Sequence, residues 1–187
     1  ETTKPDFDIN LILSDSLTSS NYTQDGYDIN VVSKGLTNEL SSELLSDIKN
    51  ATEFFNSSFG RDDRQRKITA VFRPFAENAT AGGYFRKGYF VLPKPTSAND
   101  IFRGVAHELS HYWWLNAGQQ HAWLNESFAE YSSMMAIRSI KGEKAFLDEL
   151  DRKTKLNNGL PAIYGFDRTK NPRQTPMVLY VKGALKL

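Results

Sequence analysis

The residues best suited to chemistry in this sequence lie at 107–111, where two histidines flank a glutamate in the pattern HELSH. On an α-helix, residues four apart share one face, so the imidazoles of His107 and His111 can bind one metal ion. Glu108 follows the first histidine directly and can reach a water molecule on that ion. The pattern predicts zinc-dependent hydrolysis, in which zinc lowers the pKa of its water towards about 7 and Glu108 accepts the proton.

Histidine and cysteine are scarce, and this limits the other sites that the chain can build. The 187 residues contain three histidines and no cysteine, which excludes disulfides, thiolate zinc clusters, iron–sulfur centres and cysteine nucleophiles. In a chain with so few histidines, a chance HELSH pentapeptide is a poor explanation. The third histidine, His121, is interpreted as a polar loop residue in preference to a ligand.

A catalytic zinc ion needs a third protein ligand and one open coordination position. Because cysteine is absent, a glutamate from the following helix is the natural candidate. Residues 123–131 (WLNESFAEY) offer Glu126 and Glu130, four residues apart on one helical face. The residue types alone leave both carboxylates open as the third ligand.

These segments resemble the gluzincin metallopeptidases of the aminopeptidase N type. That family carries HExxH, commonly followed by an aromatic residue, and then WLNEGFA(E)Y on the next helix. Here, residues 107–114 read HELSHYWW and residues 123–131 read WLNESFAEY, with Ser127 in place of the usual glycine and no clear consequence of that change. The resemblance is specific in these motifs and weaker from about residue 27 to the chain end. It implies a thermolysin-like zincin fold and one zinc ion.

The resemblance points to two different third ligands. The family usually has eighteen residues between the second histidine and the glutamate, which selects Glu130, whereas the WLNE motif selects Glu126, with fourteen residues between it and His111. We favour Glu126, because loops lose residues readily and residues 117–122 look about four residues short. A one-turn shift of the helix would instead rotate its apolar residues out of register. Glu130 is then expected one turn further on, as an acceptor for a ligand histidine.

Residues 180–185 (YVKGAL) resemble the family's Tyr-x-Lys-Gly-Ala-Leu segment. The resemblance implies that the hydroxyl of Tyr180, together with zinc, stabilises the tetrahedral oxyanion. A phenol donor directed at developing negative charge suits that role. An ordinary half-buried helical tyrosine is the competing interpretation.

The strand before the zinc helix departs from the family pattern. The family has Gly-x-Met-Glu-Asn there, and its glutamate binds the free α-amine of the substrate. The corresponding residues here are Gly82, Gly83, Tyr84, Phe85 and Arg86. An aromatic ring thus replaces the carboxylate, and the cation that follows repels an ammonium group, so exopeptidase specificity does not follow from the resemblance. We expect these residues to bind the backbone of an extended peptide; the alternative is an ordinary edge strand.

Hydrophobic periodicity predicts the elements that must position these residues. Strands are expected at 7–13, 27–31, 67–75 and 82–92. Helices are expected at about 40–59, 99–113, 125–140, 143–152 and from 175, with Asn99 or Asp100 capping the histidine helix and Thr175 the last one. Strands and helices do not alternate regularly, which favours an α+β fold over a doubly wound sheet.

The expected organisation is a single metallopeptidase catalytic domain over 1–187. It comprises a small mixed α/β lobe at 1–98, a helical lobe at 99–187 and a zinc site between them. The chain starts without methionine and stops in an apolar periodic stretch, so we expect flanking domains of a longer protein. A net charge of +1 gives no electrostatic case for nucleic acid, and no apolar run approaches the roughly 18 residues of a membrane span.

The leading hypothesis is zinc-dependent hydrolysis of peptide bonds in a peptide or protein substrate. One alternative is an endopeptidase or oligopeptidase with no need for a free amino terminus, which the missing amine anchor favours. The other is a non-catalytic zinc- or peptide-binding domain, which Glu108 argues against because a structural site has no need of it. A cysteine-free chain suits the cell envelope, secretion and the cytoplasm equally, so no compartment is assigned.

Overall fold

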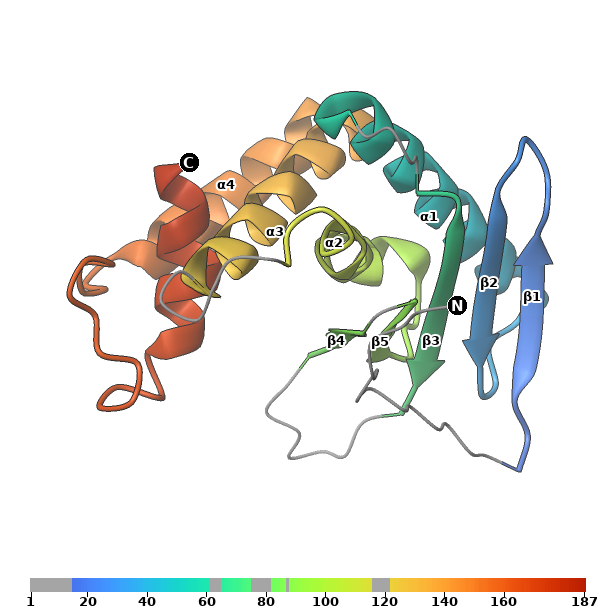
Figure 1. Cartoon of the computed structure of the whole chain (residues 1–187), viewed down its shortest axis with the longest axis horizontal. Coiled ribbons are helices and arrows are strands. Elements are labelled where there is room, and N and C mark those ends of the chain that lie inside the picture. Colours follow the sequence, from blue (N-terminus) through green and yellow to red (C-terminus); the bar gives the residue numbers. More distant parts are fainter. Residues whose placement is uncertain (1–14, 61–64, 75–81, 87, 116–121) are drawn as a thin grey trace, which may run out of the picture.

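The structure of the chain is a computed structural model that describes residues 15–60, 65–74, 82–86, 88–115 and 122–187. The strand expected at 7–13, most of the short loop at 117–122 and His121 lie outside the described residues. In Figure 1 the sheet lies on one side of the molecule and α3, α4 and the C-terminal helix on the other, with α2 between them.

Five strands form one mixed sheet in the order β1-β2-β3-β5-β4. Their bounds are Thr18–Tyr22 for β1, Asp28–Ser33 for β2, Lys67–Arg73 for β3, Tyr84–Arg86 for β4 and Tyr89–Pro93 for β5. The three central strands β2, β3 and β5 are parallel, and each edge strand is antiparallel to its neighbour. The strands predicted near 27–31 and 67–75 are therefore confirmed as β2 and β3.

Residues 82–92 form a hairpin and not the single strand that their composition predicted. β4 and β5 pair antiparallel, with Phe85 opposite Phe90. The chain reverses through Gly88, which has a φ of 95°. Glycine reaches this left-handed region without a steric penalty, and this is the reason why an apolar aromatic run turns here. As a result the sheet ends in β4, an edge strand that contacts α2.

Helix α1 (Asn38–Phe59) confirms the first predicted helix and packs against β2. The hydroxyl of Thr37 accepts a hydrogen bond from the backbone N–H of Leu40 at 3.2 Å, which caps the N-terminus. Gly60 ends the helix with a φ of 53°. Leu44, Ile48 and Phe55 are fully buried in the core between α1 and the sheet.

Helix α2 (Ala98–Ser110) presents two different faces. Phe102, Val105 and Leu109 are buried in the core, whereas the i, i+4 positions His107 and His111 project from another side of the helix. The N-cap is Ser97, whose hydroxyl accepts from the N–H of residue 100 at 3.2 Å. The prediction of a cap at Asn99 or Asp100 was wrong, because the helix begins earlier than its apolar periodicity.

Among the described residues, the regular elements that follow α2 are all helical. Helix α3 (Ala122–Ala136) continues into the π-helical turn η2 (Ile137–Lys141), and α4 (Glu143–Asn157) follows after a glycine. A second π-helical segment, η3 (Met177–Gly183), runs into the short 3₁₀ helix η4 (Ala184–Lys186). Thr175 does not cap this segment, since its hydroxyl bonds to the carbonyl of Asn171 at 3.0 Å. Among the described residues no helix is both long and apolar enough to cross a bilayer.

Candidate metal centre

His107, His111 and Glu126 converge between α2 and α3, and one potential ligand atom from each lies within 4.8 Å of the others. Oε2 of Glu126 is 3.3 Å from Nε2 of His107 and 3.7 Å from Nε2 of His111. Tetrahedral ligands at 2.0–2.2 Å from a zinc ion are separated by about 3.3–3.6 Å. The separation of 3.3 Å therefore equals an edge of a zinc coordination tetrahedron, and that of 3.7 Å is slightly longer than one.

The carboxylate of Glu126 has an oxygen that the protein leaves unsatisfied. Within the described part of the chain, buried Oε2 has no hydrogen-bond partner, although two imidazole nitrogens face it. Buried carboxylate oxygens are normally bonded, so this one calls for a cation or a proton. Two histidines and a carboxylate also form a usual donor set for catalytic zinc. The three residues thus offer a donor set that suits a zinc ion, and the two carboxylate–imidazole separations lie close to those of a zinc site.

Both imidazoles have an oxygen next to the ring nitrogen that points away from Glu126. Nδ1 of His111 lies 3.0 Å from the carbonyl of Trp114, and Nδ1 of His107 lies 3.5 Å from Oε1 of Glu130. The carbonyl of Trp114 favours the tautomer of His111 that keeps the proton on Nδ1 and leaves the lone pair of Nε2 free for a metal. Nδ1 of His107 forms no hydrogen bond within the described part of the chain, and Glu130 is its near carboxylate.

Glu130 lies on α3 one turn beyond Glu126, and both of its oxygens are already bound. Arg103 donates to Oε1 at 2.7 Å and Lys153 donates to Oε2 at 2.8 Å. Burial by itself would raise the pKa of Glu130, but the charges of His107, Lys153 and Arg103 outweigh it and lower that pKa. Glu130 is therefore an ionised carboxylate whose two oxygens are both engaged, whereas Oε2 of Glu126 has no hydrogen-bond partner among the described residues.

Glu108 lies next to the proposed ligands and close to Gly83, the residue that precedes β4. Burial raises the pKa of its carboxyl to about 7, against the opposing influence of His107. A β-carbon on Gly83 would lie 2.9 Å from Oε1 of Glu108 and 2.9 Å from the carbonyl of Val91. Only glycine allows the chain to pass so close to this carboxylate.

Tyr180 reaches the same centre from η3. Its ring stacks on the imidazole of His107, with centroids 5.3 Å apart and planes inclined by 23°. Burial first, and then the carboxylate of Glu126, raise the pKa of Tyr180 above its ordinary value. The phenol is thus kept protonated and able to donate a hydrogen bond.

The residues expected to bind substrate lie at and just before β4, beside α2. The ring of Phe85 packs edge-on against Tyr112 at 4.8 Å and lies 5.8 Å from the imidazole of His111. The guanidinium of Arg86 lies over the ring of Tyr84 at 4.9 Å. An aromatic side chain therefore occupies the flank of the metal centre, and no carboxylate stands at this position of the strand.

Three residues near the centre were not predicted from the sequence: Arg103, Ser127 and Lys153. Arg103 precedes His107 by four residues, a spacing that already indicates a shared helical face. The hydroxyl of Ser127 donates to the carbonyl of Leu179 at 3.0 Å, and a β-carbon on Gly183 would lie 1.9 Å from that hydroxyl oxygen. The serine that replaces the family's glycine therefore joins α3 to η3.

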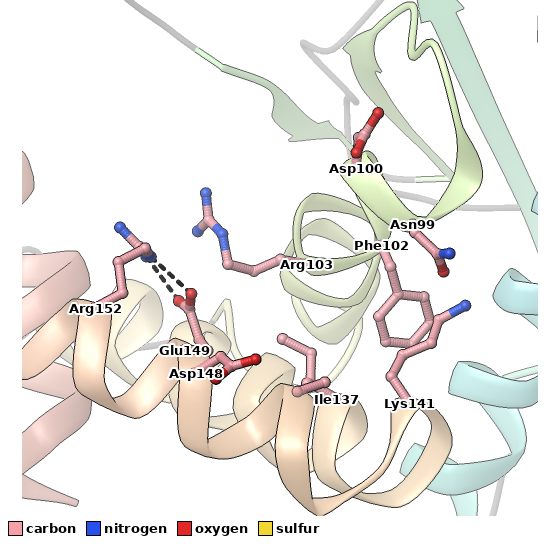
Figure 2. A pocket seen from close by; sticks show the side chains of 10 residues that line it. Asn99, Asp100, Phe102, Arg103, Ile137, Lys141, Asp148, Glu149 and Arg152 are labelled. Atoms are coloured by element: carbon pink, nitrogen blue, oxygen red, sulfur yellow. Dashed lines mark hydrogen bonds and ion pairs between the residues drawn. The ribbon is translucent and has the colours of Figure 1, made fainter.

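A pocket of about 590 Å³ lies at the N-terminal half of α2, between this helix, η2 and α4 (Figure 2). Arg103 projects into the pocket from α2, and Arg152 of α4 forms two hydrogen bonds with Glu149, both 2.7 Å long. The three basic side chains of the lining are each paired with a carboxylate: Arg103 with Glu130, Lys141 with Asp47 and Arg152 with Glu149. Each basic side chain of this pocket thus already has a carboxylate partner within the protein.

The fold is that of aminopeptidase N family proteins. The crystal structure of such a protein from Idiomarina loihiensis superposes with a TM-score of 0.66 over 91% of this chain and 36% of that chain, at 15% sequence identity. The sequence is similar to endoplasmic reticulum aminopeptidase 2 of Homo sapiens, with 32% identity over 114 residues, or 49% of this chain and 11% of that protein. No protein-family model matches the chain. The two likenesses confirm the resemblance to the aminopeptidase N family, of whose proteins this chain spans only a part.

Proposed function

We propose that the chain carries a zinc-dependent peptidase site, in which a metal-activated water hydrolyses a peptide bond. The observation that carries this proposal is the convergence of His107, His111 and Glu126, with one carboxylate oxygen unsatisfied between two imidazoles. The sequence likeness to an aminopeptidase supports hydrolysis of peptide bonds as the reaction class.

Each group of the centre has a role that its surroundings support. When bound, zinc supplies an acidified water and polarises the scissile carbonyl. Glu108 would accept a proton from that water and deliver it to the leaving amine as the C–N bond breaks. Tyr180 donates from its phenol to the oxyanion that forms on the substrate carbonyl. Glu130, whose Oε1 lies 3.5 Å from Nδ1 of His107, orients this imidazole from the side of the ring that faces away from Glu126.

The proposed architecture is thermolysin-like, with an α/β lobe at 1–98, a helical lobe at 99–187 and the zinc site between them. The position of α2 supports this division, because one face of the helix is buried against the sheet and the histidines approach α3. In this arrangement, residues 82–86 line the route by which a peptide reaches the metal.

A second candidate is an endopeptidase or oligopeptidase, and Phe85 favours it. The packing of this ring against Tyr112 and near His111 places apolar surface where an exopeptidase of the family has its amine-binding carboxylate. Arg86, next along the edge strand, adds positive charge that disfavours an ammonium group. A substrate held through its backbone by β4 has no need of a free amino terminus.

The test compares two substrates on the zinc-loaded chain, an aminoacyl-anilide and an internally quenched, N-acetylated peptide. We expect hydrolysis that a chelator abolishes and added zinc restores, with the acetylated peptide cleaved at least as fast if the second candidate is right. Glu108→Gln is expected to keep the metal and lose turnover. Stoichiometric zinc binding without turnover of either substrate would contradict the peptidase proposal and leave a non-catalytic zinc domain.

A further inference from the structure

A lysine is fully buried where α3, α4 and η3 meet. Lys153 of α4 has no exposed surface, and its ammonium donates to Oε2 of Glu130 at 2.8 Å and to the backbone carbonyl of Tyr180 at 2.9 Å. A carboxylate oxygen of Glu149 lies 3.6 Å away. A buried ammonium is strongly unfavourable unless it is paired, so this lysine depends on its acceptors as they depend on it.

The two hydrogen-bond acceptors of Lys153 approach one imidazole from different elements. Glu130 of α3 lies 3.5 Å from Nδ1 of His107, and the ring of Tyr180 from η3 stacks on the same imidazole. The ammonium of Lys153 therefore links Glu130, which lies beside the proposed ligand His107, to the backbone of Tyr180, the proposed oxyanion donor. A displacement of α4 would be transmitted to both.

The segment that carries Tyr180 has an unusual backbone. Residues 177–183 form a π-helix, a conformation that is rare and frequent at functional sites. Side chains from two neighbouring helices bind consecutive carbonyls of this segment: Ser127 binds that of Leu179, and Lys153 binds that of Tyr180. These two bonds anchor the segment at the residue that presents the phenol.

We propose that Lys153 is a positioning residue, which holds Tyr180 and Glu130 in one fixed arrangement around His107. The inference rests on the proposed function, because it is the geometry of that site which Lys153 maintains. Arg103 binds the other oxygen of Glu130 at 2.7 Å, so Glu130 keeps a charged partner when Lys153 is replaced. Removal of the lysine then breaks the link to Tyr180 without leaving an isolated carboxylate.

The test compares Lys153→Met with Lys141→Met. Methionine keeps the length and apolar volume of lysine and removes the ammonium. Lys141 is the matched control, because it also lies at the junction of helices and donates to both oxygens of Asp47, at 2.7 and 2.9 Å, but has no contact with the metal centre. Both variants lose an ion pair, and only Lys153→Met perturbs the proposed site.

The first readout is independent of turnover. With cobalt(II) in place of zinc, we expect Lys153→Met to shift the visible ligand-field bands and to raise the zinc dissociation constant about tenfold, the usual effect of losing a group that orients a ligand. Lys141→Met is expected to leave both unchanged, even if its thermal midpoint falls as far. Should Lys153→Met fail to fold, Lys153→Gln keeps an amide donor toward Glu130 and allows the same comparison.

The second readout is a double-mutant cycle on kcat. If Lys153 acts through Tyr180, Lys153→Met adds little to the loss that Tyr180→Phe causes alone, and KM changes little. Fully additive losses, or cobalt bands identical to those of the unmodified chain, would overturn the inference. Failure of the unmodified chain to bind metal would instead overturn the proposed function, and this inference with it.

Discussion

Gly83 leaves no room for a side chain beside the carboxylate of Glu108: a β-carbon at residue 83 would lie 2.9 Å from Oε1 of Glu108 and 2.7 Å from Cδ2 of Leu92. We therefore expect Gly83→Ala to displace Glu108 and lower kcat about 10–100-fold, since small displacements of a catalytic group have such effects. Zinc content should be retained. Gly82→Ala changes the same proposed substrate-binding segment but adds a β-carbon that meets nothing within 4 Å, so the difference between the two variants isolates the contact with Glu108. Equal losses in Gly82→Ala and Gly83→Ala would contradict this explanation.

The two glutamates of α3 should respond differently to substitution. Glu126→Ala is expected to lose zinc, because it removes the oxygen that faces both imidazoles. Glu130→Gln should only weaken binding, about 10–100-fold, because it changes the group behind His107. Metal stoichiometry by mass spectrometry, together with chelator competition, measures both effects. Loss of zinc from the Glu130 variant alone would reverse the assignment of the third ligand.

Glu130→Ala should lower the stability of the chain as well as its affinity for zinc. It removes a carboxylate that pairs with the buried ammonium of Lys153 and with Arg103. Breaking a buried ion pair by removing one partner typically costs about 3–5 kcal/mol. We expect a large fall in the unfolding free energy of Glu130→Ala, measured by urea denaturation of the zinc-free chain, and a smaller fall for Glu126→Ala. Similar stabilities of the two variants would contradict the burial argument.

Ser127 and Gly183 lie so close together that a substitution at one should be compensated by a substitution at the other. A β-carbon on Gly183 would overlap Oγ of Ser127 at 1.9 Å and its Cβ at 2.8 Å, so rotation of the hydroxyl cannot relieve the clash. Gly183→Ala should destabilise the chain by about 1–3 kcal/mol. Adding Ser127→Gly should recover most of this loss, apart from about 1 kcal/mol for glycine within a helix. Thermal unfolding of the single and double variants tests the pair; additive losses would show that the contact is not responsible.

Phe85 makes a prediction about substrate choice. Phe85→Glu restores a carboxylate beside the metal centre and should raise hydrolysis of the aminoacyl-anilide relative to the N-acetylated peptide. Phe85→Leu removes the contact with Tyr112 without adding charge and is the control for lost packing. The ratio of kcat/KM for the two substrates is the relevant measurement. An unchanged ratio in Phe85→Glu would show that residue 85 does not face the substrate's amino terminus.

The sequence predicted those parts of the structure that depend on local spacing. His107 and His111 share a face because they are four residues apart, and α1 begins and ends near residues whose types favour capping. The hairpin at 82–92 was missed because its turn depends on one glycine within an aromatic run. β1 was missed because its residues are polar and it pairs along one edge only.

Tertiary packing accounts for what the sequence could not reveal. Lys153 looks like any surface lysine in a charged helix, and its burial becomes apparent only when α3, α4 and η3 come together. The choice between Glu126 and Glu130 was likewise ambiguous in sequence. Arg103 and Lys153 bind both oxygens of Glu130 in the structure, which supports Glu126 as the proposed third ligand.

The edge strand β4 contains three residues, Tyr84–Arg86, and so spans about 10 Å at the usual rise of a strand. A peptide that adds to this edge is held by main-chain bonds over about three residues. A shift of the pairing register by one residue would turn every peptide side chain to the opposite face of the sheet. A bound peptide therefore keeps the same side chains on each face only when its register shifts by two residues. If β4 binds substrate as proposed, an edge this short fixes which peptide side chains face the sheet and does not depend on the total length of the peptide.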